Sequence, residues 1–158
     1  MNDVTFARAL HVLAIVLWVG GVGMATTVLL PALRRLPDSG QRIAMFQDIE
    51  NRFGPQARLS ILVAGLSGLY MLVRMDLWDR FTSLHYWWMH AMVLVWLIFA
   101  IMLFVIEPFV LHRHFAAHAK VNPDAAFRKL HSLHIVLLVL ALVTILGAMM
   151  GSHGLFLG

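Results

Sequence analysis

The chain has 158 residues, of which 61% are hydrophobic and only 13% are charged, whereas a soluble domain usually has about 25% charged residues. This composition excludes a soluble globular protein. The absence of cysteine excludes disulfides, iron–sulfur clusters and covalently attached c-type heme, which all need a thiol. The formal charge of +4 does not indicate a nucleic-acid partner, because basic residues beside membrane spans mainly set orientation.

Four uncharged segments lie between the charged residues, at 9–33, 59–73, 81–106 and 130–158. A backbone inside lipid must satisfy its own hydrogen bonds, and these runs are too long for barrel strands. Since about 20 apolar residues cross a bilayer as a helix, the sequence predicts an all-α integral membrane protein with four transmembrane helices. We expect one domain over residues 1–158, with helices at about 5–34, 55–75, 82–113 and 129–152 in the lipid bilayer.

The basic residues are concentrated in two connections. Nine of the twelve follow the first and third predicted helices: Arg34, Arg35, Arg42, Arg52, Arg58, Arg113, Lys120, Arg128 and Lys129. The positive-inside rule then places both connections in the cytoplasm and both termini outside, in a bacterial-type inner membrane.

The first connection has an amphipathic pattern. Ile43, Phe46, Ile49 and Phe53 fall near one helical face, after Asp38 or Ser39 as a possible N-cap. The pattern predicts a short amphipathic helix over residues 41–53, lying on the membrane surface as a lid over the bundle.

Nine histidines carry the functional signal, because imidazoles at membrane depth usually bind a group or move protons. His11, His85, His90 and His153 fall toward the outer side in the predicted topology. His112, His114, His118, His131 and His134 fall toward the inner side.

The depth of two outer histidines predicts a heme b site. His11 in the first helix and His90 in the third lie at similar depth, as axial ligands of one iron require. Arg8 precedes His11 by nearly one turn and is the expected partner of a heme propionate. Alternatively, His11 and His90 are structural histidines bonded to neighbouring helices.

Met92 is a rival ligand in the same helix as His90. It is two residues further on and therefore about 200° round the helix, so both side chains cannot face one iron. Two histidine ligands would favour simple electron transfer, whereas a histidine and a methionine would tend to raise the potential. We favour His90, but the sequence leaves both open.

The inner layer offers a possible second site. His131 and His134 are three residues apart, and His112 lies at the facing end of the third helix. They suit a second heme or a metal ion, or they are solvated interfacial side chains. Glu107 is costly in lipid unless it is paired. We expect Arg58 as its partner, with a quinone or proton site as the alternative.

A family resemblance rests on four short motifs. They are L-H-V-L-A-I-V-L-W-V-G-G at residues 10–21, Arg58-Leu59, Trp88-Met89-His90-Ala91 and Phe127-Arg128-Lys129-Leu130. In this order they resemble HemJ-type protoporphyrinogen oxidases and the related CopD-like membrane proteins. The resemblance implies a bundle of four or five helices that binds heme b, with a first-helix histidine that His11 matches.

The chain departs from the HemJ pattern in two places. The third-helix pattern W-L-H-x-K has a lysine where this chain has Met92, whose thioether cannot donate a proton. The pattern F-R-x-L-N-E-x-P is replaced by F-R-K-L-H-S-L-H, which includes His131 and His134. We therefore expect electron transfer with a quinone or another membrane redox partner, without efficient protoporphyrinogen oxidation.

Copper handling, associated with CopD-like proteins, is the alternative function. Thioethers and imidazoles suit Cu(I), and a set of methionines falls on the outer side with His85, His90 and His153: Met71, Met75, Met89, Met149 and Met150. Separately, Gly147 and Gly151 form a G-x-x-x-G motif that can pair helices within the bundle or in a homodimer, or make room for a flat macrocycle.

Overall fold

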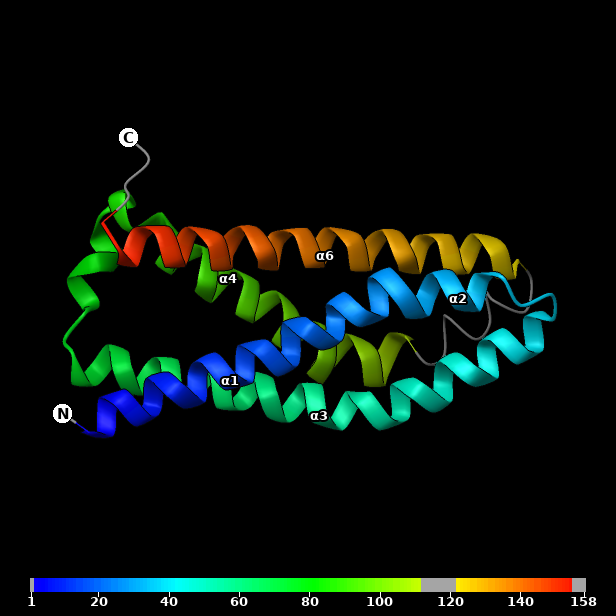
Figure 1. The fold of residues 1–158 in the computed structure, drawn as a ribbon, viewed down its shortest axis with the longest axis horizontal. Coiled ribbons are helices and arrows are strands. Elements are labelled where there is room, and N and C mark those ends of the chain that lie inside the picture. The colour runs from blue at the N-terminus through cyan, green and yellow to red at the C-terminus, as the bar shows by residue number, and fades with distance from the viewer. Residues whose placement is uncertain (1, 112–121, 155–158) are drawn as a thin grey trace.

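The protein is an all-α membrane bundle. A computed structural model describes residues 2–111 and 122–154. Within these ranges four helices are long and apolar enough to cross a membrane: Asn2–Arg34, Ser39–Arg74, Leu84–Glu107 and Asp124–Ser152. They lie lengthwise beside one another (Figure 1), and the predicted four-helix membrane fold is confirmed. We call the end where the first helix begins and the last helix ends the terminal end, and the opposite end the distal end.

The first span is a single rod with a widened turn. It consists of α1 (Asn2–Met24), the π-helical η1 (Ala25–Leu29) and α2 (Leu30–Arg34). The backbone N–H of Leu30 donates to the carbonyl of Ala25, five residues earlier, as a π-helix requires. Pro31 follows directly and has no N–H to continue the α-helical pattern.

The second span is longer than expected and includes the predicted amphipathic segment. Helix α3 runs without interruption from Ser39 to Arg74, and Asp38 caps it by accepting from the N–H groups of Gly40 and Gln41. Pro55 therefore lies inside this helix, and residues 41–53 do not form a separate surface helix.

The apolar face of this early part of α3 is covered by protein. Phe46 is buried in a core with Leu30, Leu33, Phe127 and Leu130, which belong to α2 and the last helix. The segment expected to lie on the membrane surface instead closes the distal end of the bundle.

The third span begins with two short 3-10 turns, η2 (Trp78–Thr82) and η3 (Leu84–Tyr86). It continues as α4 (Trp87–Ile101) and becomes the π-helical η4 (Met102–Leu111). The last span, α6 (Pro123–Ser152), begins earlier than expected because Asn122 caps it by accepting from the N–H of Ala125.

The helices pack as two main pairs, α1 on α3 and α4 on α6. A core of Trp18, Ile61, Phe99 and Leu137 joins all four spans. Trp18 and Phe99 meet edge to face with ring centroids 4.8 Å apart.

Aromatic rings fill the space beside several glycines. A Cβ at Gly147 or Gly151 would collide with the ring of Trp87 or Trp88, respectively, and a Cβ at Gly65 would collide with Trp96. The G-x-x-x-G motif of α6 is therefore occupied by α4 of the same chain.

Candidate functional site

His11 is fixed against α3 through one ring nitrogen. Its Nδ1 lies 2.8 Å from the carbonyl oxygen of Ala64 and 3.1 Å from Oγ of Ser67. Because a carbonyl oxygen can only accept, Nδ1 carries the proton and Nε2 carries the lone pair. Among the described residues Nε2 has no hydrogen-bond partner.

A glycine allows the imidazole to approach α3 this closely. A Cβ at Gly68 would lie 3.2 Å from Cε1 of His11, so even a methyl group would press on the ring. Ala64, Ser67 and Gly68 together determine where the His11 ring lies and which nitrogen remains open.

His90 is directed toward the terminal-end segment. Its Nε2 lies 3.1 Å from the carbonyl oxygen of Phe81, and its Nδ1 lies 3.3 Å from that of Tyr86. The ring also meets the ring of Phe81 edge to face at 5.4 Å. A neutral imidazole has one N–H, so only one of these carbonyls can receive a hydrogen bond from it.

His11 and His90 contact different partners. The α4 side chain that reaches α3 near His11 is Trp96, whose Nε1 donates to the carbonyl of Ile61 at 2.9 Å. His90 precedes Trp96 by six residues, which is about 9 Å along a helix. Of the other expected site residues, Arg8 is exposed and Met92 is half-buried.

At the distal end, His131 binds a backbone carbonyl that Pro31 leaves without its π-helical partner. In a π-helix the carbonyl of Thr26 would accept from residue 31, but proline has no N–H. Nε2 of His131 lies 2.9 Å from this oxygen and can donate to it. The side chain therefore satisfies a buried backbone group, which is costly in lipid when left unpaired.

In the third span, Arg58 likewise bonds to a backbone carbonyl that Pro108 leaves without its π-helical donor. The carbonyl of Leu103 lies five residues before Pro108, and Nε of Arg58 donates to it at 3.1 Å. Nη2 of Arg58 also donates to Oε1 of Glu107 at 2.8 Å. The predicted Arg58–Glu107 pair is thus confirmed.

The carboxylate of Glu107 is buried and lies against α3. A Cβ at Gly54 would be 3.2 Å from its Oε1. Glu50, one turn before Gly54, interacts electrostatically with both Glu107 and Arg58. Two carboxylates therefore share the charge of one guanidinium at the distal end.

The expected inner metal site is only partly described. Nδ1 of His134 donates to the carbonyl of Leu130 at 3.0 Å, so His134 and His131 have different partners. His112 lies outside the described residues. Within residues 2–111 and 122–154 no group of three His, Asp or Glu side chains is arranged to hold a metal ion.

The methionines expected around copper differ in exposure. Met89 is buried, whereas Met75 and Met149 are exposed. His85 is exposed and meets the ring of Tyr86 edge to face at 5.3 Å. Nδ1 of His153 lies 2.8 Å from the carbonyl of Met149.

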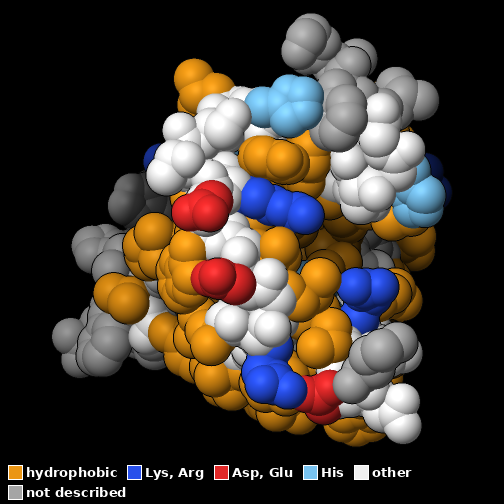
Figure 2. Space-filling model, turned by 90° about the vertical axis from the view of Figure 1, so that its left-hand side faces the viewer, with side chains coloured by type: hydrophobic (Ala, Val, Ile, Leu, Met, Phe, Trp, Pro, Cys, Tyr) orange, Lys and Arg blue, Asp and Glu red, His pale blue; other side chains and the backbone are white. Residues whose placement is uncertain are grey.

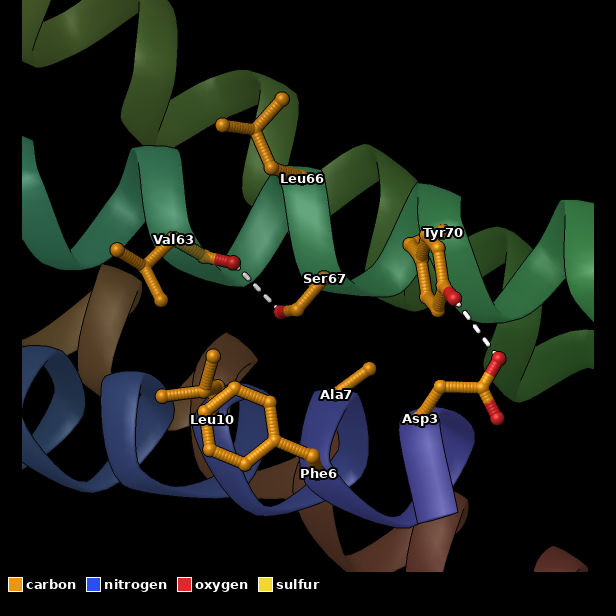
Figure 3. Close-up of a pocket in the computed structure, with 8 residues that line it drawn as sticks. All are labelled: Asp3, Phe6, Ala7, Leu10, Val63, Leu66, Ser67 and Tyr70. Carbon is orange, nitrogen blue, oxygen red and sulfur yellow. Dashed lines mark hydrogen bonds between the residues drawn. The ribbon is translucent and has the colours of Figure 1, made fainter. Parts of the chain in front are cut away.

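A groove between α1 and α3 has no counterpart in the sequence analysis (Figure 3). It has a volume of about 420 Å³, and its apolar walls are formed by Phe6, Ala7, Leu10, Val63 and Leu66. Asp3, Ser67 and Tyr70 supply its polar atoms. Finding it required the pairing of α1 with α3, which no motif indicates.

The groove opens near the terminal end. Figure 2 looks onto this end and shows acidic, basic and histidine side chains interspersed among apolar ones. Asp3 is held there by Tyr70 and Arg74: the Tyr70 hydroxyl donates to Oδ2 at 2.9 Å, and Nη2 of Arg74 donates to the same oxygen at 3.0 Å.

Fold and site together define a multi-pass helical membrane protein that has a histidine with one open ring nitrogen and a partly buried Arg–Glu pair. No family model, curated protein or solved structure matches the chain.

Proposed function

We propose that the protein binds heme b through His11 and transfers electrons within the membrane. The observation that carries this proposal is the fixed His11 ring, with Nδ1 donating to Ala64 and Nε2 open. Histidines that bind metals almost always donate their other ring N–H to a carbonyl, carboxylate or water. The donor set around His11 therefore fits a histidine that would hold a heme iron.

His90 is the candidate for the opposite ligand. In the neutral ring, one of its two nitrogens has a lone pair directed at a carbonyl oxygen. That nitrogen makes no hydrogen bond in its present position, so its lone pair is the one available to a ligand once the ring turns. Met92 is the rival, and Arg8, one turn from His11 toward the terminal end, is the cation for a propionate.

Bound heme b would supply a one-electron couple at this position. The chain's own contribution is to orient the His11 ring through Ala64 and Ser67 and to exclude water. Trp18 and Phe99 continue the interior away from His11 as buried aromatic side chains.

The proposal also covers the membrane, the orientation of the chain in it and the redox partner. Arg34, Arg42 and Arg52 lie in the distal halves of the chain's first two spans. By the positive-inside rule this supports an orientation with both termini outside a bacterial-type inner membrane. A quinone or another membrane redox partner would exchange electrons with the protein, and a homodimer would have to use a surface other than the glycines of α6.

The test is the visible spectrum of the detergent-purified protein, as isolated and after dithionite, together with a metal assay. We expect non-covalent heme b, and we expect His11→Ala to lose it. His85→Ala is the matched control, because His85 is exposed and distant in sequence from the His11 contact. Undiminished heme in His11→Ala, or bound copper without heme, would contradict the proposal.

The ligand from α4 has its own prediction. His90→Ala should convert a six-coordinate spectrum to a five-coordinate one or abolish heme binding, with Met92→Leu as the comparison. If only Met92→Leu has this effect, the assignment of His90 is wrong.

Met92 also separates this proposal from protoporphyrinogen oxidation. Since a thioether cannot donate a proton, the unmodified chain should fail to complement a strain that lacks its protoporphyrinogen oxidase. Met92→Lys restores the lysine of the HemJ pattern and should complement better. Robust complementation by the unmodified chain would contradict the prediction.

A further inference from the structure

The groove between α1 and α3 has the size and lining of a small-molecule site. Its volume of about 420 Å³ lies within the roughly 300–1,000 Å³ typical of such sites, which are mainly apolar with a few polar groups. Phe6 and Leu66 on its walls are largely exposed, at 65% and 68%. In a membrane the groove would therefore open toward lipid, so that an apolar ligand can enter from the bilayer.

The polar atoms of the groove are mainly acceptors. The hydroxyl of Tyr70 donates its proton to Asp3, and the hydroxyl of Ser67 donates its proton to the carbonyl of Val63 at 2.5 Å (Figure 3). Each hydroxyl oxygen keeps lone pairs after its only proton is committed. Nearly all of the groove's surface is apolar, and the few polar atoms that reach it are oxygens that accept hydrogen bonds, so the complementary head group is a donor.

The charges at the rim favour a neutral ligand. Nε and Nη2 of Arg74 both donate to Oδ2 of Asp3, at 3.2 Å and 3.0 Å. The guanidinium is thus already paired with a carboxylate, which weakens its attraction for a phosphate. A phospholipid head group is therefore a poorer match than a neutral ring that bears hydroxyl groups.

We propose that this groove binds the reduced ring of an isoprenoid quinol, with a ring hydroxyl donating to the hydroxyl oxygen of Tyr70, which is more exposed than Ser67. The apolar walls accommodate the ring and the start of the tail, and the rest of the tail extends into lipid. A quinone of the same skeleton has carbonyl acceptors in place of hydroxyl donors, so the groove discriminates by oxidation state.

The quinol would lie next to the histidine of the proposed heme site. Oγ of Ser67 both lines the groove and lies 3.1 Å from Nδ1 of His11. The role of the quinol as reductant rests on the proposed function. Its oxidation to quinone would release two protons, to the water at the terminal end, and two electrons. The proposed heme would take these electrons one at a time and would pass the first to the membrane redox partner before it takes the second. Binding of the quinol itself does not depend on heme.

The proposal can be tested by equilibrium binding to the full chain in phosphatidylcholine nanodiscs without oxygen. The two probes are decylubiquinol and decylubiquinone. We expect saturable binding, with the quinol about tenfold tighter, the effect of roughly one hydrogen bond. Tyr70→Phe should remove most of this preference. Tyr86→Phe is the matched control, since Tyr86 lies outside the groove.

A second pair of variants tests the location. Val63→Trp places a large side chain in the groove, toward which Val63 points in Figure 3, and should abolish quinol binding. Leu69→Trp alters an exposed leucine on the same helix that does not line the groove, and should leave binding intact. Equal affinity for both probes, or binding that Val63→Trp leaves unchanged, would overturn the proposal.

The heme content of the same samples separates this proposal from the proposed function. Heme without quinol binding would overturn the groove proposal alone. Quinol binding without heme would overturn the electron-transfer proposal and leave the groove proposal supported.

Discussion

Replacement of Arg58 by methionine tests the energetics of the distal end most directly. Arg58 pairs with Glu107 and also donates to the carbonyl of Leu103, which lies five residues before Pro108. Methionine keeps a long apolar side chain but removes every donor. The variant therefore leaves a buried carboxylate without its guanidinium and a backbone carbonyl without this donor.

The expected cost follows from these two losses. Removing one partner of a buried ion pair costs about 3–5 kcal/mol. The Arg58 side chain is 32% exposed and that of Glu107 is 9% exposed, so we take the lower end, about 3 kcal/mol. Loss of the bond to Leu103 adds about 1 kcal/mol.

The assay is the free energy of unfolding from a detergent-denaturation titration followed by circular dichroism. Arg52→Met is the matched control on the same helix, because Arg52 is 80% exposed and pairs only at the surface with Asp48. Such surface pairs contribute less than about 1 kcal/mol.

A double variant tests whether the Arg58 and Glu107 charges are coupled. Adding Glu107→Leu to Arg58→Met removes the buried carboxylate that has lost its guanidinium and should recover about 2 kcal/mol of the loss. If Arg58→Met costs no more than Arg52→Met, the pair does not stabilise the bundle. If the two losses simply add, the charges are not coupled.

Two further predictions use the same unfolding assay. Gly147→Ala should destabilise the bundle by about 1–3 kcal/mol, since its methyl group collides with the ring of Trp87. Gly20→Ala, where nothing lies within 4 Å, should be neutral or stabilising, and equal stability of the two variants would contradict the packing argument. His131→Leu should cost about 1–3 kcal/mol by leaving a buried carbonyl without a donor. Pro31→Ala restores a backbone N–H and should reduce that cost, whereas an undiminished loss would mean that His131 acts in another way.

The spans were predictable because charge in lipid is costly, and that rule needs no knowledge of packing. The same rule misplaced the start of the second helix. The uncharged run begins at Leu59, and Pro55 just before it suits a helix start. In the structure Pro55 is exposed, and so is Asn51, whose carbonyl loses its α-helical donor there. An exposed carbonyl can bond to water, so the helix continues through the proline.

The groove and the His11 contact could not be predicted from the sequence, for a different reason. A helix that is apolar nearly all round gives no sign of which face meets which neighbour. His11 was expected at membrane depth, but its bond to Ala64 depends on the pairing of α1 with α3. The role of Ser67, which contacts His11 and lines the groove, depends on the same pairing.

The prolines of the first and third spans give a structural role to some of the polar side chains that the sequence analysis assigned to ligand binding. Pro31 and Pro108 each follow by five residues a carbonyl in a π-helical segment, and each of these carbonyls has a side-chain donor from another helix. His131 is one of these donors, so its Nε2 already has a partner. A metal at that nitrogen would have to displace it from the carbonyl of Thr26 and leave that oxygen unpaired in a membrane. The histidine expected in an inner metal site thus has a structural role that opposes metal binding there, whereas Nε2 of His11 faces no such competition among the described residues.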